Sequence, residues 1–254
     1  MTQTTRTFGG AEVHFPPQSS AGAGDEFVEV RVTSPGASGA DRAGSPGGRN
    51  QRIRLHDYER IFAVPGLYEE IVQRRLGCRT PARIAGLLAR AAARLGWAPG
   101  DVRILDAGAG NGVSGEAFAQ LGMRPVVGLD ILPAARDAAL RDRPGVYGAY
   151  LAADLGALAP DEERLIRDAA PNALACVGSV GGGHLPVAAV AAALELLAPD
   201  ALVTYAYHPE LGADPLLALL RDAEPLVRER ALHRRTVTGG ERHCEAVVVR
   251  LARR

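Results

Sequence analysis

A glycine-rich turn that follows an acidic residue is the clearest chemical feature of this sequence. Residues 102–118, "VRILDAGAGNGVSGEAF", run from an apolar strand pattern through the turn into a helical pattern. Glycines let the backbone approach a ligand closely, and the free N–H groups at the start of a helix can bind an anion. The segment therefore predicts a ligand site at a strand–helix junction.

The turn fits two registers. Gly110, Gly112 and Gly115 match the G-x-G-x-x-G of a dinucleotide site, whereas Gly108, Gly110 and Gly112 follow the acid Asp106. A carboxylate beside a pyrophosphate would be repulsive, but beside an ammonium or sulfonium group it is favourable. Asp106 therefore favours the second register, in which Gly115 lies one turn into the helix and allows close helix–strand packing.

Further polar and glycine positions follow the next predicted strands. "VVGLDIL" places Asp130 at the end of the second strand, where a carboxylate could take both hydroxyls of a ribose. "YLAADL" places Asp154 after the third strand, where it could meet an adenine amino group. "ACVGSVGGG" is a glycine-rich exit from the fourth strand. The carboxyl ends of parallel strands face one crevice, so we expect these residues to line the same site.

Residues 102–252 resemble a class I S-adenosylmethionine-dependent methyltransferase. The resemblance rests on "ILDAGAGNG", "GLDIL" and "AADL" in that order, on the strand–helix alternation and on a terminal hairpin. It implies S-adenosyl-L-methionine as cofactor and S-adenosyl-L-homocysteine as product. It further implies that the motif around Asp106 surrounds the methionine portion, that Asp130 binds the ribose, that Asp154 lies near the adenine, and that the exit of the fourth strand lies near the sulfonium. The implied cofactor-binding residues are Asp106, Gly108, Ala109, Gly110, Asn111, Gly112, Asp130, Ile131, Asp154, Leu155, Gly178 and Ser179.

Candidate catalytic residues stand at the mouths of the fourth and fifth strands. Methyl transfer is an in-line displacement helped mainly by positioning, and a general base is needed only when the acceptor must lose a proton. We take His184, Tyr207 and His208 as the candidates, with Tyr205 and Glu210 beside them in "TYAYHPE". Packing explains the two tyrosines equally well, and His184 could simply begin a helix.

Composition and missing motifs point to a small-molecule acceptor, methylated at O, N or C. Basic and acidic residues both number 29, which argues against a dedicated nucleic-acid binder. No [DN]-P-P-[YF] motif follows the fourth strand, and Cys176 lies within that strand without a preceding proline. The three cysteines are far apart, which excludes a disulfide framework and a zinc site and predicts a reducing cytoplasm. We expect no metal, no signal peptide and no membrane span, and the sequence specifies no oligomeric state.

Two other function classes remain open. One is an NAD(P)-dependent oxidoreductase that uses the "GNGVSG" turn. The other is a non-catalytic methyltransferase-like binding protein whose acceptor pocket is lost.

The elements that must position these residues define an α/β fold. Scarce aromatics and abundant Ala and Leu favour helix-rich packing. We predict a doubly wound, mostly parallel seven-stranded sheet with a C-terminal antiparallel hairpin around Gly239-Gly240. Predicted strands cover 102–107, 125–130, 147–152, 173–178 and 201–207; predicted helices cover 112–121, 132–141, 160–169, 185–198 and 214–223.

The part before residue 99 is expected to be a separate region. Residues 1–25 are predicted to be poorly ordered, and residues 26–98 form a β-hairpin and a helical lid with a flexible loop at 34–50; residues 99–254 form the cofactor-binding domain. Within the lid, Thr80 and Pro81 predict an N-cap and a first helical turn, and Gly96 predicts the helix end. Tyr58 and Tyr68 are candidates for substrate contact.

Overall fold

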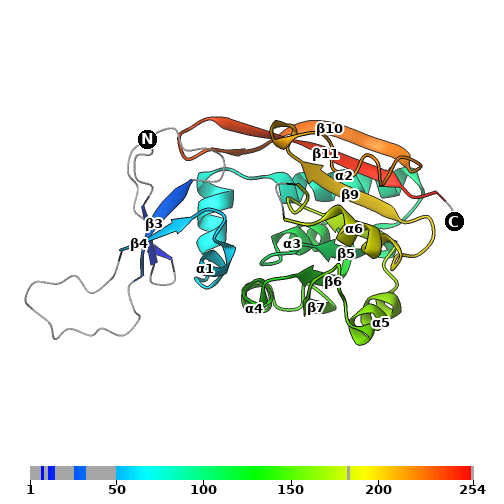
Figure 1. Cartoon of the computed structure of the whole chain (residues 1–254), viewed down its shortest axis with the longest axis horizontal. Coiled ribbons are helices and arrows are strands. Elements are labelled where there is room, and N and C mark those ends of the chain that lie inside the picture. Colours follow the sequence, from blue (N-terminus) through cyan, green and yellow to red (C-terminus); the bar gives the residue numbers. More distant parts are fainter. Residues whose placement is uncertain (1–6, 9–10, 15–25, 33–49, 182–183, 253–254) are drawn as a thin grey trace, which may run out of the picture. The chain divides into compact units, whose positions relative to one another are not determined.

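The computed structural model describes residues 7–8, 11–14, 26–32, 50–181 and 184–252. The chain divides into two compact units (Figure 1). One comprises residues 1–77 with 235–241, and the other comprises residues 78–234 with 242–254.

The larger unit holds a seven-stranded sheet in the order β10-β11-β9-β8-β5-β6-β7. Five strands are parallel, and β11 pairs antiparallel with β9. The predicted fold class is therefore confirmed. The strand order reverses at β5, which has β6 on one side and β8 on the other, and ligands of open α/β sheets bind at such a switch point. The strands are β5 (Arg103–Ala107), β6 (Arg124–Asp130), β7 (Ala149–Ala152), β8 (Ala173–Cys176), β9 (Leu202–Tyr207), β10 (Glu224–Arg235) and β11 (Glu241–Arg250).

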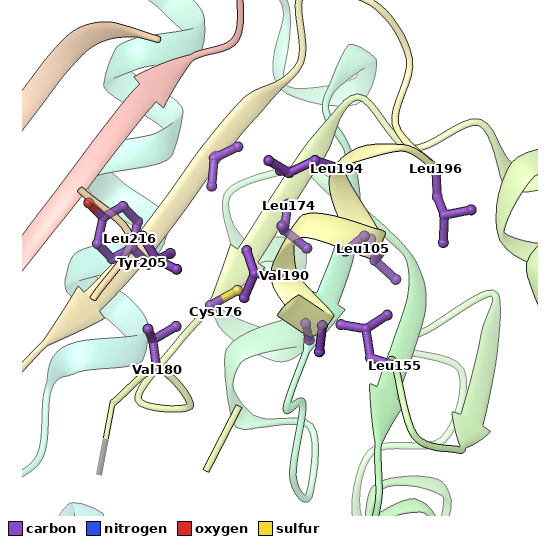
Figure 2. Packing of buried hydrophobic residues seen from close by; sticks show 14 of the residues in the cluster. Leu105, Leu155, Leu174, Cys176, Val180, Val190, Leu194, Leu196, Tyr205 and Leu216 are labelled. Atoms are coloured by element: carbon purple, nitrogen blue, oxygen red, sulfur yellow. The ribbon is translucent and has the colours of Figure 1, made fainter. Parts of the chain in front are cut away.

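Alternating residues of the strands belong to two apolar clusters, one on each face of the sheet. Ile104 packs with α2 (Thr80–Arg94) and α3 (Val113–Gln120) on one face. Leu105 packs with α5 (Pro160–Ala169) and α6 (Val187–Leu194) on the other. Figure 2 shows side chains of β5, β8, β9 and α6 meeting in this second cluster. Helix α4 (Pro133–Asp142) follows β6, and the short 3-10 helices η2 (Pro99–Asp101) and η3 (Pro209–Leu211) precede β5 and follow β9.

The predicted helices at 112–121, 132–141 and 160–169 are confirmed within one residue at each end, but two others are not. The helix expected over 185–198 spans only Val187–Leu194, because the following N–H groups bond three residues back instead of four. The helix expected over 214–223 is wrong, and consecutive turns occupy 215–222. These turns still bury Leu216 and Leu220 in the core.

The start of α2 also differs from the prediction. The N-cap residue is Arg79, which makes no side-chain capping hydrogen bond, and Thr80 is the first helical residue. Its hydroxyl instead lies 2.8 Å from Nδ1 of His233 on β10. The end of the helix at Gly96 is as predicted, with φ +77°.

The smaller unit is a four-stranded antiparallel sheet with two helices. The predicted hairpin is present as β3 (Phe27–Val32) and β4 (Asn50–Arg54). Within the segment predicted to be poorly ordered, β1 (Thr7–Phe8) and β2 (Ala11–His14) extend this sheet; the rest of 1–25, and 34–49 of the predicted loop, lie outside the described residues. Helix α1 (Tyr58–Phe62) and the π-helix η1 (Glu69–Arg75) follow. Tyr58, Phe62 and Tyr68 form an aromatic cluster, and the lid role of this region stays a prediction.

A buried carboxylate holds the segment after β9 in place. Asp214, whose side chain is 4% exposed, accepts hydrogen bonds from the Tyr205 hydroxyl, the Leu216 N–H and the Arg228 guanidinium. A carboxylate with three donors fixes this irregular segment where a regular helix was expected.

We expect Asp214→Ala to lower the free energy of unfolding by about 3 kcal/mol, because it leaves the Tyr205 hydroxyl and the Leu216 N–H without their acceptor. Urea denaturation measures this loss. Asp222→Ala, which breaks an ion pair with both side chains more than three-quarters exposed, is the matched control and should change stability by less than about 0.5 kcal/mol. Equal effects of the two substitutions would contradict the assignment.

Candidate functional site

The turn between β5 and α3 has the backbone that its glycines predict. Gly108, Gly110 and Gly112 have φ values of +73°, +55° and +87°. A Cβ built on Gly108 would lie 2.9 Å from Oγ of Ser179, so the exit of β8 packs directly on the turn. The Ser179 hydroxyl also donates to the Ala107 carbonyl at 2.8 Å. The predicted residues of the first and fourth strand ends therefore meet.

The N–H groups of this turn are largely used within the protein. Those of Gly108 and Ala109 donate to the Leu129 carbonyl at 2.8 and 3.0 Å, and that of Gly112 donates to the Ala109 carbonyl. The Gly110 N–H donates to Oδ2 of Asp130 at 2.9 Å. A carboxylate thus occupies the donor that a bound phosphate would otherwise take.

Asp130 at the end of β6 is half-buried and joins two parts of the site. Its Oδ1 accepts from the Leu132 N–H at 3.0 Å while Oδ2 holds the turn. Burial raises the pKa of Asp130, and the N–H groups of Leu132, Gly110 and Ile131 and the nearby His184 partly offset that rise. Each oxygen keeps a lone pair that could accept a ligand hydroxyl.

Asp106 lies fully buried beneath the turn. Its Oδ2 accepts from the Ser114 hydroxyl at 2.6 Å and from the Tyr147 hydroxyl at 2.7 Å. Its Oδ1 has no hydrogen-bond partner among the described residues. Burial raises the pKa of Asp106 to about 6; the Ser114 and Tyr147 hydrogen bonds oppose this rise, and the charge of Asp130 adds to it.

Tyr147 and Tyr150 are site residues that the sequence analysis missed. Their rings meet edge to face, with centroids 5.4 Å apart. The Tyr150 hydroxyl donates to the Gly110 carbonyl, while that of Tyr147 reaches Asp106. Gly115 serves packing, as predicted, but its partner is the Tyr147 ring and not a strand. Two tyrosines close to the start of the third strand, in a chain with few aromatics, were the available signal.

The remaining predicted cofactor residues differ in exposure. Ile131 is 64% exposed, the highest fraction for a large hydrophobic side chain in the described part of the chain. Asp154 is exposed, and its Oδ1 accepts from the Gly156 N–H, so it caps a turn. The side chain of Leu155 lies in the core, which leaves only its backbone for a ligand (Figure 2). Gly178 has φ +72° with open space around it.

Residues that come between these positions also hold the turn. Ala109 and Asn111 are buried. The Asn111 carbonyl accepts from Arg143, which also pairs with Glu116. Ala109 and Asn111, both predicted as cofactor residues, therefore shape the turn through their backbone.

The catalytic candidates lie in three different surroundings. His184 is exposed and interacts electrostatically with Asp130. Tyr207 is 7% exposed and its hydroxyl accepts from Arg228 at 3.0 Å, which is the setting of a packed core residue.

His208 belongs to a small imidazole cluster. Its Nδ1 lies 3.1 Å from the His243 carbonyl, and its ring meets that of His233 edge to face at 4.5 Å. Burial, with the nearby His208, Arg234 and Arg242, lowers the pKa of His233 to about 3. His233 was not among the sequence candidates because it comes from the distant hairpin.

Comparisons with known proteins agree with this architecture. No family model matches the chain, and no curated protein sequence does. Among solved structures, the N-methyltransferase NodS from Bradyrhizobium japonicum, solved with S-adenosyl-L-homocysteine, is similar with a TM-score of 0.54 and 15% identity; the match covers 77% of this chain and 97% of that chain. A TehB-like SAM-dependent methyltransferase from Corynebacterium glutamicum is similar with a TM-score of 0.51 and 19% identity, covering 78% of this chain and 98% of that chain.

The chain has the class I S-adenosylmethionine-dependent methyltransferase fold. The glycine turn, Asp106 and Asp130 stand at the switch point of that fold. Across the described residues, no helix is long and apolar enough to cross a membrane. In the same part of the chain, no three His, Cys, Asp or Glu side chains form a group that could hold a metal ion.

The raised pKa of Asp106 predicts a pH-dependent stability. The carboxyl ionises near 3.8 in the unfolded chain and near 6 in the folded one. The folded protein therefore holds this proton more tightly than the unfolded chain does. The resulting contribution to the free energy of unfolding is fully present below about pH 4 and is lost as pH rises through 6. The difference between these two pKa values corresponds to about 3 kcal/mol of stability.

Urea denaturation between pH 4 and 7 tests this. The free energy of unfolding of Asp106→Asn relative to wild type should rise by up to about 3 kcal/mol across that range. Asp137→Asn, on the exposed surface of α4, is the control and should show a difference that changes by less than about 0.5 kcal/mol. A pH-independent gap for Asp106→Asn would contradict a buried, ionisable Asp106.

Proposed function

We propose that the protein is an S-adenosylmethionine-dependent methyltransferase with a small-molecule acceptor. One observation carries this proposal: Asp130 takes the Gly110 N–H, and a second carboxylate, Asp106, lies under the same turn. The turn thus offers carboxylates where a dinucleotide would need donors. A ligand with cationic groups and a ribose is complementary to it.

The residues present fit the cofactor. The unpartnered Oδ1 of Asp106 is an acceptor for the ammonium group, and Asp130 has lone pairs for the ribose hydroxyls. The exposed Ile131 offers an apolar surface for the purine ring. When bound, the cofactor supplies an electrophilic methyl group. The fold similarity to methyltransferases supports the same assignment.

The oxidoreductase alternative is less compatible with the turn. A pyrophosphate would lie beside Asp130, and three of the turn's N–H groups already donate to carbonyl oxygens. In the register of that alternative, Gly115 would serve the ligand, but here it accommodates Tyr147.

Among the catalytic candidates, we assign proton acceptance to His208, and the contact of its ring supports this choice. A carbonyl oxygen can only accept, so the contact with the His243 carbonyl puts the hydrogen on Nδ1 of His208. Neutral His208 then has its lone pair on Nε2, the arrangement of a general base. This orientation favours an acceptor that loses a proton, such as a hydroxyl or an amine.

Composition and cysteine burial also support the acceptor class and the cellular compartment that we propose. A net charge of zero fits a small-molecule acceptor better than nucleic acid. All three cysteines are buried and unbridged, which suits a reducing cytoplasm.

Isothermal titration calorimetry tests the cofactor. We expect saturable binding of S-adenosyl-L-homocysteine, and Asp130→Ala should weaken it roughly 100-fold, since it removes the ribose acceptor and releases the turn. Asp161→Ala, on the exposed start of α5, should bind like wild type. Stabilisation by NAD(P) without any response to S-adenosyl-L-homocysteine would reverse the proposal.

Turnover of S-adenosyl-L-methionine with a panel of hydroxyl- and amine-bearing metabolites tests His208. We expect His208→Asn to lower kcat by about 100-fold or more while the Kd for S-adenosyl-L-homocysteine stays within about twofold. Tyr207→Phe, which loses only the contact with Arg228, should keep its turnover. If no acceptor in a broad panel is methylated, the non-catalytic alternative is favoured.

A further inference from the structure

The ring of Tyr147 occupies a niche made by three glycines. A Cβ at Gly115 would lie 2.5 Å from the phenolic oxygen, one at Gly128 would lie 3.1 Å from Cδ1, and one at Gly112 would lie 3.3 Å from Cε2. These glycines belong to α3, β6 and the glycine turn respectively. The absence of side chains at three separate elements admits the tyrosine and brings its hydroxyl to Asp106.

The hydroxyl of Tyr147 makes the two oxygens of Asp106 different. Oδ2 receives two donors, from Tyr147 at 2.7 Å and Ser114 at 2.6 Å. Oδ1 receives none among the described residues, although it is buried. An unsatisfied buried carboxylate oxygen is costly, so its persistence points to a donor that a ligand supplies.

Tyr150 provides an internal comparison. It touches the same edge of the site, and a Cβ at Gly128 would lie 2.9 Å from its ring. Its hydroxyl, however, goes to the neutral carbonyl of Gly110 and not to the carboxylate. The two phenols therefore brace the turn in different ways, and only one of them acts on the acid.

We propose that Tyr147 is a positioning residue of the cofactor site, which anchors Oδ2 of Asp106 so that Oδ1 is held ionised and directed to accept the ammonium group of the cofactor. This inference rests on the proposed function. Tyr147 acts through Asp106 and needs no contact with the cofactor. A ring that only filled space would have no influence on the ionisation of Asp106.

The pH dependence of cofactor binding separates these two roles. A cationic ligand group requires ionised Asp106, so affinity should fall as pH drops through about 6. Removing a donor from the carboxylate raises its pKa, so the fall should begin at higher pH.

The test is Tyr147→Phe, which keeps the ring in its niche and removes only the hydroxyl. We expect the Kd for S-adenosyl-L-homocysteine at pH 7 to rise about tenfold. We also expect the acid limb of binding, which is the pH range over which affinity falls on acidification, to move to higher pH. Tyr150→Phe is the matched control, and its acid limb should stay where it is in wild type. Ser114→Ala, which removes the other donor to Oδ2, should move the limb in the same direction as Tyr147→Phe.

Asp106→Asn identifies the group that titrates. Its acid limb should be lost, and Tyr147→Phe added to Asp106→Asn should change affinity no further, because the hydroxyl acts through the carboxylate.

Several outcomes would overturn the positioning role. One is a folded Tyr147→Phe with wild-type affinity and an unmoved limb. Another is an equal limb shift in Tyr150→Phe. A Tyr147→Phe protein that does not fold would assign the hydroxyl to stability instead. If wild-type protein binds no S-adenosyl-L-homocysteine, the proposed function itself fails, which is a different result from all of these.

Discussion

The hydrogen bond from the Gly110 N–H to Asp130 is the interaction on which the site depends. It ties the end of β6 to the turn after β5, so the two neighbouring strands share one rigid edge. It also changes the electrostatic character of that edge. A glycine turn at a helix start is ordinarily an anion site, but here its donors are taken by Asp130 and by the carbonyls of Leu129 and Ala109. What remains available are acceptors, and acceptors select a ligand with donors and positive charge.

Space is the second constraint. Tyr147 can reach Asp106 only because Gly112, Gly115 and Gly128 carry no side chains. Burying the carboxylate in this way raises its pKa and costs stability at neutral pH, as is common where a site is organised for binding instead of for folding. The protein core on either face of the sheet offsets such a cost, since it packs helices against both sides of β5.

Much of this could be predicted from sequence. The strand and helix alternation and the terminal hairpin follow from local patterns, and Gly115 serves packing, although against the Tyr147 ring and not against a strand. The helix expected at 214–223 failed because Asp214 is held by Tyr205 and Arg228, which are contacts that no local pattern records. The cap expected at Thr80 failed for a similar reason, since its hydroxyl pairs with a histidine more than 150 positions away.

By itself, the sequence determined the fold class and the location of the glycine turn, because hydrophobic period and glycine spacing are local properties. Only the tertiary structure decided which hydrogen-bonding groups of that turn are already used within the protein. Asp130, Tyr147 and Tyr150 act on it from other elements, and their hydrogen bonds depend on the neighbouring strands and on the loop before β7. The environment of His208 was likewise decided by β10 and β11, which bring His233 and the His243 carbonyl to the end of β9. Contacts between distant segments set hydrogen-bond partners and burial, and these in turn set charge and chemistry.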